Sequence, residues 1–590
     1  MNINKNLVIV LFLFVITLIS YINIFQNEFA WDDFSFIVRN IHIKDLGNIS
    51  EFFTEPSTGD LYRPLRGVFY TLTYQIWQLN VFGYHLNSFL LHFFVTLLLY
   101  FITLKLTKKT MFSLIVSLFF ATHPIHVERI TNMTGAFDVL GILFLLSSFF
   151  LYAAFSENDK KKYYFLSITF YLLALFSSEE AITLILILFL YDFSFNCKIN
   201  SNNFKLLLKK YAPYIIATIF YLAIRFSVLH KIGRAEIYFE HSFVGTLLTT
   251  IKIFVGYIII LFFPFNITIE RVVKFDTSLN LSFLISLFIL LSITFFFVKS
   301  YKKSKTMFFS IGWFFITLLP FSNLLPQFTI MADRYLYLPS YGFVLFLTFL
   351  IFKIDKIEVV KKYSMVIIVI LVFLISSTYA VLTIKTNSEW KDNFTLLSAN
   401  LKKSPLGTRT YHAMALYYRD RGDYKTAFAY ASRAVELSSK NYNAYENLGT
   451  ISAYLKNYDE AISFYNKAIE LNPDFYLAYN NLGLVYSYMN DLNSSIFYLK
   501  KAIQIDPKLS KAHNDLGTVY AKLGKFDLAI EEINKAIKFN PYEADYYYNL
   551  AVIYEFLGEK EKVENLLLKA LEIEPNNNKI KNKFTNLKSK

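Results

Sequence analysis

The sequence predicts an all-α protein in two parts: a polytopic bundle of membrane helices, followed by an α-solenoid of short helical repeats. The chain has 590 residues, of which 55% are hydrophobic, and a mean hydropathy of +0.38. This composition is too apolar for a soluble protein of such length. Apolar runs long enough to cross about 30 Å of hydrocarbon recur up to about residue 385. Beyond residue 407, a polar pattern repeats every 34 residues.

Apolar runs define about 11 membrane spans within residues 1–385. We expect these spans at 7–25, 84–104, 111–127, 134–155, 163–179, 181–195, 211–229, 280–298, 307–325, 336–353 and 364–384. The segment 243–263 is also long enough, but a further crossing there would put Lys299–Lys305 outside. We therefore predict an interfacial or re-entrant segment at 243–263. The first run lacks a small-residue cleavage site, which favours a retained signal anchor over a cleaved signal peptide.

Lysine-rich breaks between the spans predict the topology, because positively charged short loops remain in the cytoplasm. The breaks are Lys105–Lys109, Lys160–Lys162, Lys198–Lys210, Lys299–Lys305 and Lys353–Lys362. They account for the net charge of +14 without a nucleic-acid partner. With a cytoplasmic N-terminus, the C-terminal third and four polar motifs fall outside. The motifs are Trp31-Asp32-Asp33, His123–Glu128, Glu179-Glu180 and Asp333-Arg334-Tyr335.

The C-terminal third repeats with a period of 34 residues. The periodic residues are Pro473, Pro507, Pro541 and Pro575, then Ala434, Ala468, Ala502, Ala536 and Ala570, and finally Leu448-Gly449, Leu482-Gly483, Leu516-Gly517 and Leu550-Ala551. Small residues let paired helices approach, and proline ends the second helix of each unit. The pattern resembles the tetratricopeptide repeat, a helix-turn-helix unit. We predict a linker at 386–407, five repeats at 408–577 of which the first is degenerate, and a capping helix or tail at 578–590.

Two adjacent carboxylates, Asp32 and Asp33, follow the first span. One would act as a general base while the other orients it or holds a cation, because close like charges and partial desolvation raise one pKa toward the working range. A solvated loop is the alternative interpretation. Arg63, in the loop that follows, would bind a phosphate at headgroup level or would simply flank the membrane.

Further polar residues are expected near the same outer face. His123, His126 and Glu128 have a spacing that suits a divalent cation, although a structural role at a helix end explains them equally. Arg225 and Arg334 each need a carboxylate or a phosphate partner. The remaining candidate site residues are Trp31, Asp138, Glu180, Asp333 and Tyr335. Cys197 is the single cysteine, which excludes intrachain disulfides, and no P-loop or Gly-x-Gly-x-x-Gly motif is present.

The ordered set of motifs resembles the transmembrane and tetratricopeptide-repeat O-mannosyltransferases and their bacterial relatives, within the C-type (GT-C) glycosyltransferase fold. The resemblance covers nearly the whole chain. It rests on Trp31-Asp32-Asp33, Tyr62-Arg63-Pro64-Leu65, Phe82–Asn87, Ala121–Glu128 with Gly135 and Asp138, Ser178-Glu179-Glu180, Ala332–Pro339 and Glu389-Trp390-Lys391-Asp392. Two positions depart from the family pattern: Glu179 replaces the usual lysine, and Phe137 replaces a basic residue.

The resemblance implies an inverting enzyme that moves mannose or another hexose from a polyprenyl phosphate to Ser or Thr hydroxyls of a protein, at the outer or luminal leaflet. It implies that Asp32 or Asp33 is the base, and the family pattern favours Asp32. The departing phosphate would be held by fixed positive charge, for which the candidates are Arg63, Arg225 and Arg334. The repeats would bind the acceptor protein, and the candidate groove residues are Asn447, Asn481 and Asn514. Membrane lipid is a further expected partner.

Two other functions stay open. A non-enzymatic, membrane-anchored scaffold would use the repeats to recruit partners outside the cytoplasm, and Glu179 favours it. A transporter or flippase for a lipid-linked sugar would be favoured by internal repetition among the spans, which the sequence does not contain. The bias toward Asn, Ile and Lys, and the lack of an obvious retention signal, favour a bacterial plasma membrane over the endoplasmic reticulum.

Overall fold

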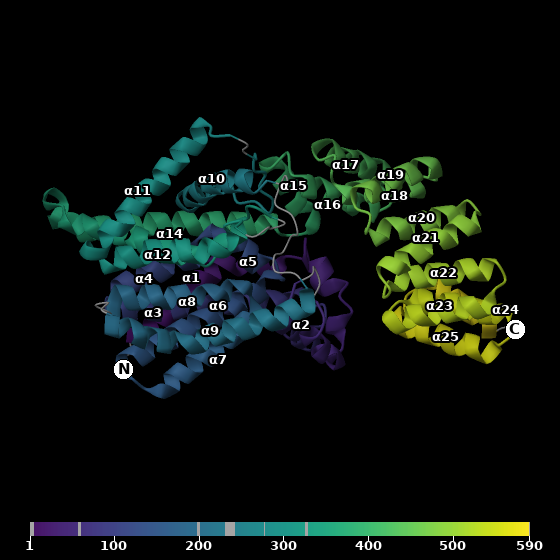
Figure 1. Cartoon of the computed structure of the whole chain (residues 1–590), viewed down its shortest axis with the longest axis horizontal. Coiled ribbons are helices and arrows are strands. Elements are labelled where there is room, and N and C mark those ends of the chain that lie inside the picture. The colour runs from purple at the N-terminus through teal and green to yellow at the C-terminus, as the bar shows by residue number, and fades with distance from the viewer. Residues whose placement is uncertain are drawn as a thin grey trace. The chain divides into compact units, whose positions relative to one another are not determined.

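The computed structural model describes residues 5–56, 61–196, 201–230, 242–275, 278–324 and 329–588. Helices and turns account for this described part, which contains no β-strand, so the predicted all-α class is confirmed. The chain divides into two compact units, Met1–Ser404 and Pro405–Lys590 (Figure 1). Cys197 and the first residues of the predicted break Lys198–Lys210 lie outside the described residues.

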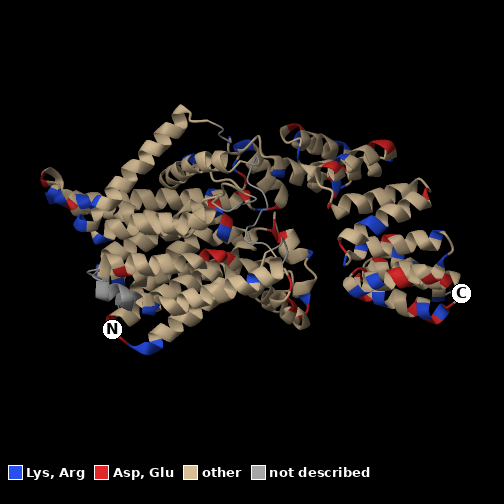
Figure 2. Cartoon of the chain, viewed as in Figure 1, with Lys and Arg blue, Asp and Glu red and all other residues tan. Residues whose placement is uncertain are grey.

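Unit 1 is a bundle built largely of apolar helices. Its α-helices are α1 (Lys5–Tyr21), α2 (Pro64–Trp77), α3 (Val81–Thr107), α4 (Thr110–Thr122), α5 (Val127–Thr131), α6 (Gly135–Asn158), α7 (Lys161–Ser177), α8 (Leu184–Tyr191), α9 (Ser201–Leu229), α10 (Phe243–Phe262), α11 (Leu281–Lys303), α12 (Lys305–Leu318), α13 (Pro339–Phe352), α14 (Ser364–Glu389) and α15 (Asn393–Lys403). Most charged residues lie near helix ends, and long stretches of helix carry none (Figure 2).

Seven helices in the described part of the chain are long and apolar enough to cross a membrane, or eight if one bent pair is a single span. They are Asn6–Gln26, Val81–Thr107, Gly135–Asn158, Leu208–Leu229, Phe243–Phe262, Leu281–Lys303 and Glu358–Glu389, with the pair Thr110–Thr122 and Pro124–Thr131 bent by 50°. α11 and α14 leave most of their apolar side chains exposed, which is the kind of surface that lipid covers.

The predicted count of about 11 spans is not confirmed. Four of the predicted spans fall on short helices, and α8 is the shortest of them with 8 residues. A 3-10 turn, Glu179–Thr183, precedes α8 and a π-helical turn, Asp192–Asn196, follows it. Hydropathy averages over such interruptions and therefore overestimates helix length. Conversely, α10 is a regular apolar helix of 20 residues, long and apolar enough to cross a membrane. The interfacial or re-entrant arrangement at 243–263 stays a prediction.

Up to Lys588, unit 2 contains five pairs of antiparallel helices and a final helix. The pairs are α16 (Thr408–Arg419) with α17 (Tyr424–Leu437), α18 (Tyr442–Tyr454) with α19 (Tyr458–Leu471), α20 (Tyr476–Tyr488) with α21 (Leu492–Ile505), α22 (Ser510–Lys522) with α23 (Phe526–Phe539), and α24 (Ala544–Phe556) with α25 (Lys560–Ile573); α26 is Asn578–Lys588. The repeated glycine is required by close approach, since a Cβ on Gly483 would lie 2.6 Å from the Leu499 side chain of the paired helix. Ile580 of α26 is buried against the last pair.

Candidate functional site

The two adjacent aspartates after the first helix have different environments. Trp31 adopts a left-handed backbone with φ 55°, which is uncommon for a non-glycine residue and is found at functional turns. The Asp33 side chain points inward and is 1% exposed, with its two carboxylate oxygens accepting the backbone N–H groups of Ala30 and Thr134 at 3.1 and 2.9 Å. Burial raises the pKa of Asp33 to about 7 against the effect of these hydrogen bonds.

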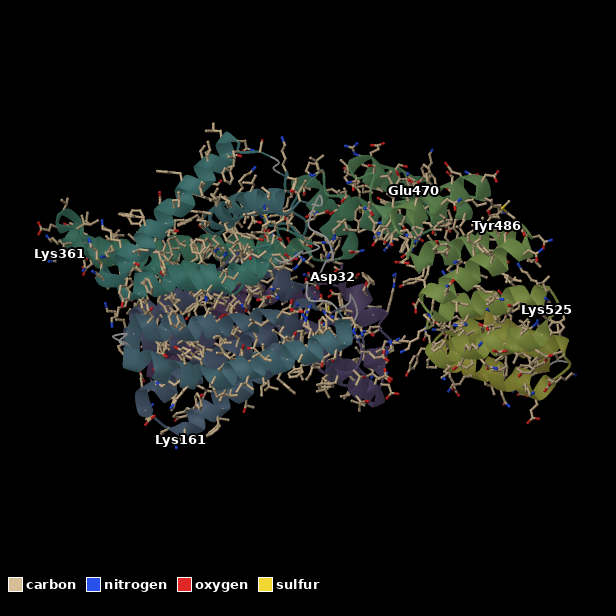
Figure 3. All side chains as sticks on the ribbon, viewed as in Figure 1. Asp32, Lys161, Lys361, Glu470, Tyr486 and Lys525 are labelled. Carbon is tan, nitrogen blue, oxygen red and sulfur yellow. The ribbon has the colours of Figure 1, made fainter. Side chains whose placement is uncertain are left out.

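Asp32 is half-buried, and its carboxylate has no hydrogen-bond or ion-pair partner within the described residues. Asp33 is thus held by backbone N–H groups, whereas the Asp32 carboxylate is unpaired as far as the described residues go. Figure 3 shows Asp32 at one end of unit 1 and Lys161 and Lys361 toward the other end. Both lysines belong to lysine-rich breaks that are predicted to be cytoplasmic. This arrangement agrees with the predicted separation of acidic motifs from lysine-rich breaks.

Arg63 is clamped by two carboxylates from different elements. Its Nε and one terminal nitrogen donate to the same oxygen of Glu179 at 3.0 and 2.8 Å, and its other terminal nitrogen donates to Asp138 at 2.7 Å. Burial alone would lower the pKa of Arg63, but the charges of Glu179 and Asp138 raise it above its usual value. The Arg63 side chain is only 7% exposed, so two anions already satisfy a cation predicted to bind phosphate.

Arg129 extends this clamp into a network. It binds the second oxygen of Asp138 and also Glu180, both at 2.5 Å, and its Nε donates to the backbone carbonyl of Arg334 at 3.0 Å. Because Asp138 accepts from both Arg63 and Arg129, these contacts connect α2, α5 and α6, and the bond of Arg129 to Glu180 adds the turn before α8. Arg129 is not among the residues predicted from the sequence, although an arginine at the end of an apolar run is a signal for buried carboxylate partners.

Arg334 is the more accessible cation of this region. Its side chain is 24% exposed, against 3% for Arg129, and within the described part of the chain its guanidinium binds a single carboxylate, that of Glu128, at 2.6 Å. Glu128 also accepts the backbone N–H of Arg334 at 3.1 Å. Burial alone would lower the pKa of Arg334, but Glu128 and, more weakly, Asp32 raise it above its usual value. The Asp32 carboxylate and the Arg334 guanidinium therefore interact electrostatically.

The neighbours of Arg334 have structural partners. Asp333 is fully buried, pairs with Arg271 and accepts the backbone N–H of Thr268 at 2.9 Å. The ring of Tyr335 stacks on Phe321 with centroids 3.9 Å apart. Sequence analysis did not find Arg271, since a single arginine in a polar loop gives no signal.

Arg225 is buried in α9 one turn after Tyr221, whose hydroxyl donates to the backbone carbonyl of Tyr62 at 3.3 Å. Tyr62 directly precedes Arg63 in the chain. The predicted arginines Arg63 and Arg225 therefore approach the same region from α2 and α9.

The two histidines predicted to lie at the site belong to the packed core. His123 caps the short helix after α4 by accepting the N–H of Ile125 at 3.1 Å, and its Nε2 contacts the carbonyl of Leu261 at 3.1 Å. Nε2 of His126 contacts the hydroxyl of Ser340 at 2.8 Å. Glu128 is engaged by Arg334, and among the residues that the structure describes no group of three His, Cys, Asp or Glu could hold a metal ion. These contacts agree with the structural interpretation of the two histidines rather than with a divalent-cation site.

An apolar cavity of about 240 Å³ lies between α10, α11, α12 and α13. Its lining includes Leu261, Phe262, Phe296, Ile311, Phe314 and Phe343. The carbonyl of Leu261 is the one that His123 contacts. One edge of the cavity therefore lies next to His123, which follows the last residue of α4.

The asparagines predicted to line an acceptor groove take part in a hydrogen-bonded ladder between repeats. At each of four junctions, the sixth residue of one repeat bonds the fifth residue of the repeat before it. The pairs are Asn447 with His412 at 2.9 Å, Asn481 with Glu446 at 2.7 Å, Asp515 with Asn480 at 3.2 Å, and Asn549 with Asn514 at 2.9 Å. Burial raises the pKa of the two carboxyls in the ladder, Glu446 and Asp515. The ladder fixes the register of the stack.

Comparisons with known proteins agree with both parts of the architecture. Sequence profiles of the tetratricopeptide repeat match residues 408–441, 442–475, 476–509, 498–531, 517–558 and 544–577. The chain is 24% identical to a protein O-mannosyl-transferase of Caenorhabditis elegans over 71% of this chain and 61% of that protein. It is 23% identical to the protein O-mannosyl-transferase TMTC3 of Homo sapiens over 71% of this chain and 50% of that protein. The chain thus spans about half the length of these curated relatives.

Among solved structures, a tetratricopeptide-repeat protein of Thermus thermophilus is 19% identical and covers 31% of this chain, with a TM-score of 0.30. The sequence and fold together define a multi-pass membrane protein with C-terminal tetratricopeptide repeats. Within that class, the chain is similar to the O-mannosyl-transferases named above.

Proposed function

We propose that this protein is an integral-membrane glycosyltransferase that moves a hexose from a polyprenyl-phosphate donor to Ser or Thr hydroxyls of an acceptor protein. The observation that carries the proposal is the electrostatic interaction of Arg334 with the Asp32 carboxylate, which has no hydrogen-bond or ion-pair partner among the described residues. A base for the acceptor hydroxyl and a cation for the leaving phosphate are the two groups that this transfer requires. The names of the curated relatives support mannose as the sugar.

In the proposed reaction, the acceptor oxygen attacks the anomeric carbon while its proton passes to the Asp32 carboxylate. The bond between the anomeric carbon and the phosphate oxygen breaks, and its electron pair leaves with the lipid phosphate. Arg334 stabilises the charge that develops on that phosphate. Attack opposite the leaving group inverts the anomeric centre.

Among the predicted phosphate ligands, accessibility and charge favour Arg334 over Arg63. Arg63 already binds Glu179 and Asp138 and is nearly inaccessible, whereas Arg334 pairs with Glu128 and is partly exposed. We therefore assign Arg63, together with Arg129, the task of holding the outer ends of the helices in place. Asp33 supports the turn that presents Asp32.

The apolar cavity between α10, α11, α12 and α13 would hold part of the polyprenyl chain, since its lining offers no polar surface. We further propose that the reaction occurs on the extracytoplasmic side and that the repeats bind the acceptor there. The lysine-rich breaks support this topology. A bacterial plasma membrane is the favoured location.

Reconstitution tests the proposal directly. The purified full chain in lipid vesicles is given polyprenyl-phosphate mannose or another hexose and a Ser/Thr-rich acceptor, and the mass of the acceptor is measured. We expect one hexose per modified hydroxyl from the wild-type chain and none from Asp32→Asn. Transfer by Asp32→Asn at the wild-type rate would refute the base assignment.

The pairing of Glu179 with Arg63 favours a second candidate, a membrane-anchored scaffold without transferase activity. A carboxylate there replaces the lysine usual in the family and neutralises a cation. The scaffold predicts no hexose transfer with any donor, and a set of bound extracytoplasmic proteins that Asp32→Asn leaves unchanged. Loss of hexose from extracytoplasmic proteins in cells lacking the chain would exclude it.

A further inference from the structure

Helix α15 lies between the two motifs that supply the proposed base and cation. It is an 11-residue helix, Asn393–Lys403, and only the short turn Trp390–Asp392 separates it from the end of α14. Two asparagines, Asn393 and Asn400, occur about two turns apart on it, a separation of about 10 Å along the helix axis. Each asparagine bonds a different part of the candidate site.

Asn393 holds the turn that carries Asp32. Its side-chain oxygen accepts the backbone N–H of Trp31 at 3.1 Å. Trp31 is the residue with the left-handed backbone, immediately before Asp32. One further bond joins the same segments, from the N–H of Glu28 to the carbonyl of Lys391 at 2.8 Å. The direction of the Asp32 side chain therefore depends on the first turn of α15.

Asn400 holds the turn that carries Arg334. It is buried, and its side-chain oxygen accepts both the hydroxyl of Thr268 and the N–H of Ile269. The N–H of Thr268 in turn donates to Asp333, the residue before Arg334. Lys403, on the next turn of α15, donates to the carbonyl of Ile267 at 2.8 Å. The last turns of α15 therefore fix the loop 267–269, which fixes the Asp333-Arg334 turn.

We propose that α15 is a positioning element, and that Asn393 and Asn400 are positioning residues that set the distance between the Asp32 carboxylate and the Arg334 guanidinium. A single rigid helix is suited to this task because it spaces two contacts without intervening flexible chain. The inference rests on the proposed function, since it assigns a role to the distance between base and cation.

The test compares alanine with aspartate at each position in the reconstituted full chain. Asn393→Ala is expected to lower kcat about 10- to 100-fold, because a displacement of about 1 Å at a reacting group costs that much, while the donor KM changes less than about twofold. Asn393→Asp keeps an oxygen acceptor for the Trp31 N–H and should restore most of the rate. Asn400→Ala is expected to raise the donor KM about 10-fold through Arg334, and Asn400→Asp to recover it.

Lys402→Gln is the matched control, because Lys402 lies on the same helix, is exposed and makes no side-chain bond within the described residues. It should keep kcat and KM within about twofold of wild type. Equal losses for Ala and Asp at position 393, or the same loss for Lys402→Gln, would overturn the inference.

Hydrogen exchange separates failure of this inference from failure of the proposed function. In Asn393→Ala, the amide of Trp31 should exchange about 10-fold faster while the 267–272 segment stays protected; Asn400→Ala should show the converse. If the wild-type chain transfers no sugar, the proposed function fails. The exchange pattern alone then tests whether α15 positions the two turns. Unchanged protection at Trp31 and at 267–272 in the two variants would overturn the role of α15.

Discussion

Alanine at positions 32 and 33 is expected to separate chemistry from folding. The Asp32 carboxylate makes no hydrogen bond or ion pair within the described chain. Removing it should therefore change the free energy of unfolding by less than about 0.5 kcal/mol. Loss of a general base should lower the rate of transfer about 100- to 10,000-fold.

Asp33→Ala removes two hydrogen bonds at once. The backbone N–H groups of Ala30 and Thr134 would lose their acceptor in a buried environment. An orphaned buried donor costs about 1–3 kcal/mol, so the total is about 2–6 kcal/mol. This variant should unfold at lower temperature, and any loss of transfer should follow the loss of folded protein.

Two measurements on the same detergent-solubilised samples check both expectations. Tryptophan fluorescence gives the unfolding midpoint, and acceptor mass gives the transfer rate of the fraction that remains folded. A large destabilisation by Asp32→Ala, or wild-type stability with lost activity in Asp33→Ala, would refute the assignment of Asp32 to chemistry and Asp33 to structure.

Three further outcomes follow from the geometry. Because burial raises the pKa of Asp33 to about 7, the protonated carboxyl stabilises the fold fully below about pH 4, and this stabilisation is lost as the pH rises to about 7. The free energy of unfolding of unit 1 should therefore fall by up to about 4 kcal/mol over this range. Thermal unfolding midpoints measured across the same pH range should vary less for Asp33→Asn than for the wild type. Glu179→Lys would bury a second cation beside Arg63 and should cost about 3–5 kcal/mol in chemical unfolding, with Glu179→Gln intermediate; wild-type stability of Glu179→Lys would contradict the clamp. Gly135→Ala would place a Cβ 2.4 Å from the backbone carbonyl oxygen of Arg129 and should destabilise the chain by at least about 1–3 kcal/mol, measurable as a lower unfolding midpoint; no change would contradict this close approach.

The repeats were predictable because each structural requirement recurs in the sequence. The small residue in every first helix is required by the helix packed against it, as the close approach of Gly483 to Leu499 demonstrates. A requirement that appears once is easily missed, whereas one that recurs at a constant interval is unmistakable. The spans were less predictable, because a run of apolar residues such as 181–195 does not reveal that a turn and a π-helical segment interrupt it.

The residues of the candidate site could be predicted from the sequence, but the ion pairs among them could not. Charge patterning indicated which acidic and basic motifs share one face, but it does not specify which cation each carboxylate binds. Asp32 and Asp33 have identical side chains, and only the structure reveals that Asp33 is the buried one, held by the N–H groups of Ala30 and Thr134. Arg129 was missed because the sequence does not reveal that Asp138 of α6 and Glu180 of the turn before α8 both meet it.

The hydrogen-bonded ladder restricts the order in which the repeats can be stacked, although all repeats have the same length. Each junction joins residues from two neighbours, so a repeat is compatible only with particular predecessors. Excising 442–475 would bring Asn481 against His412, a pairing like the one Asn447 makes now. Excising 476–509 would instead bring Asp515 against Glu446, two buried carboxylates that cannot both ionise at such close range. Two deletions of equal size thus differ in consequence, and shuffling of repeats during evolution is restricted to exchanges that keep complementary neighbours.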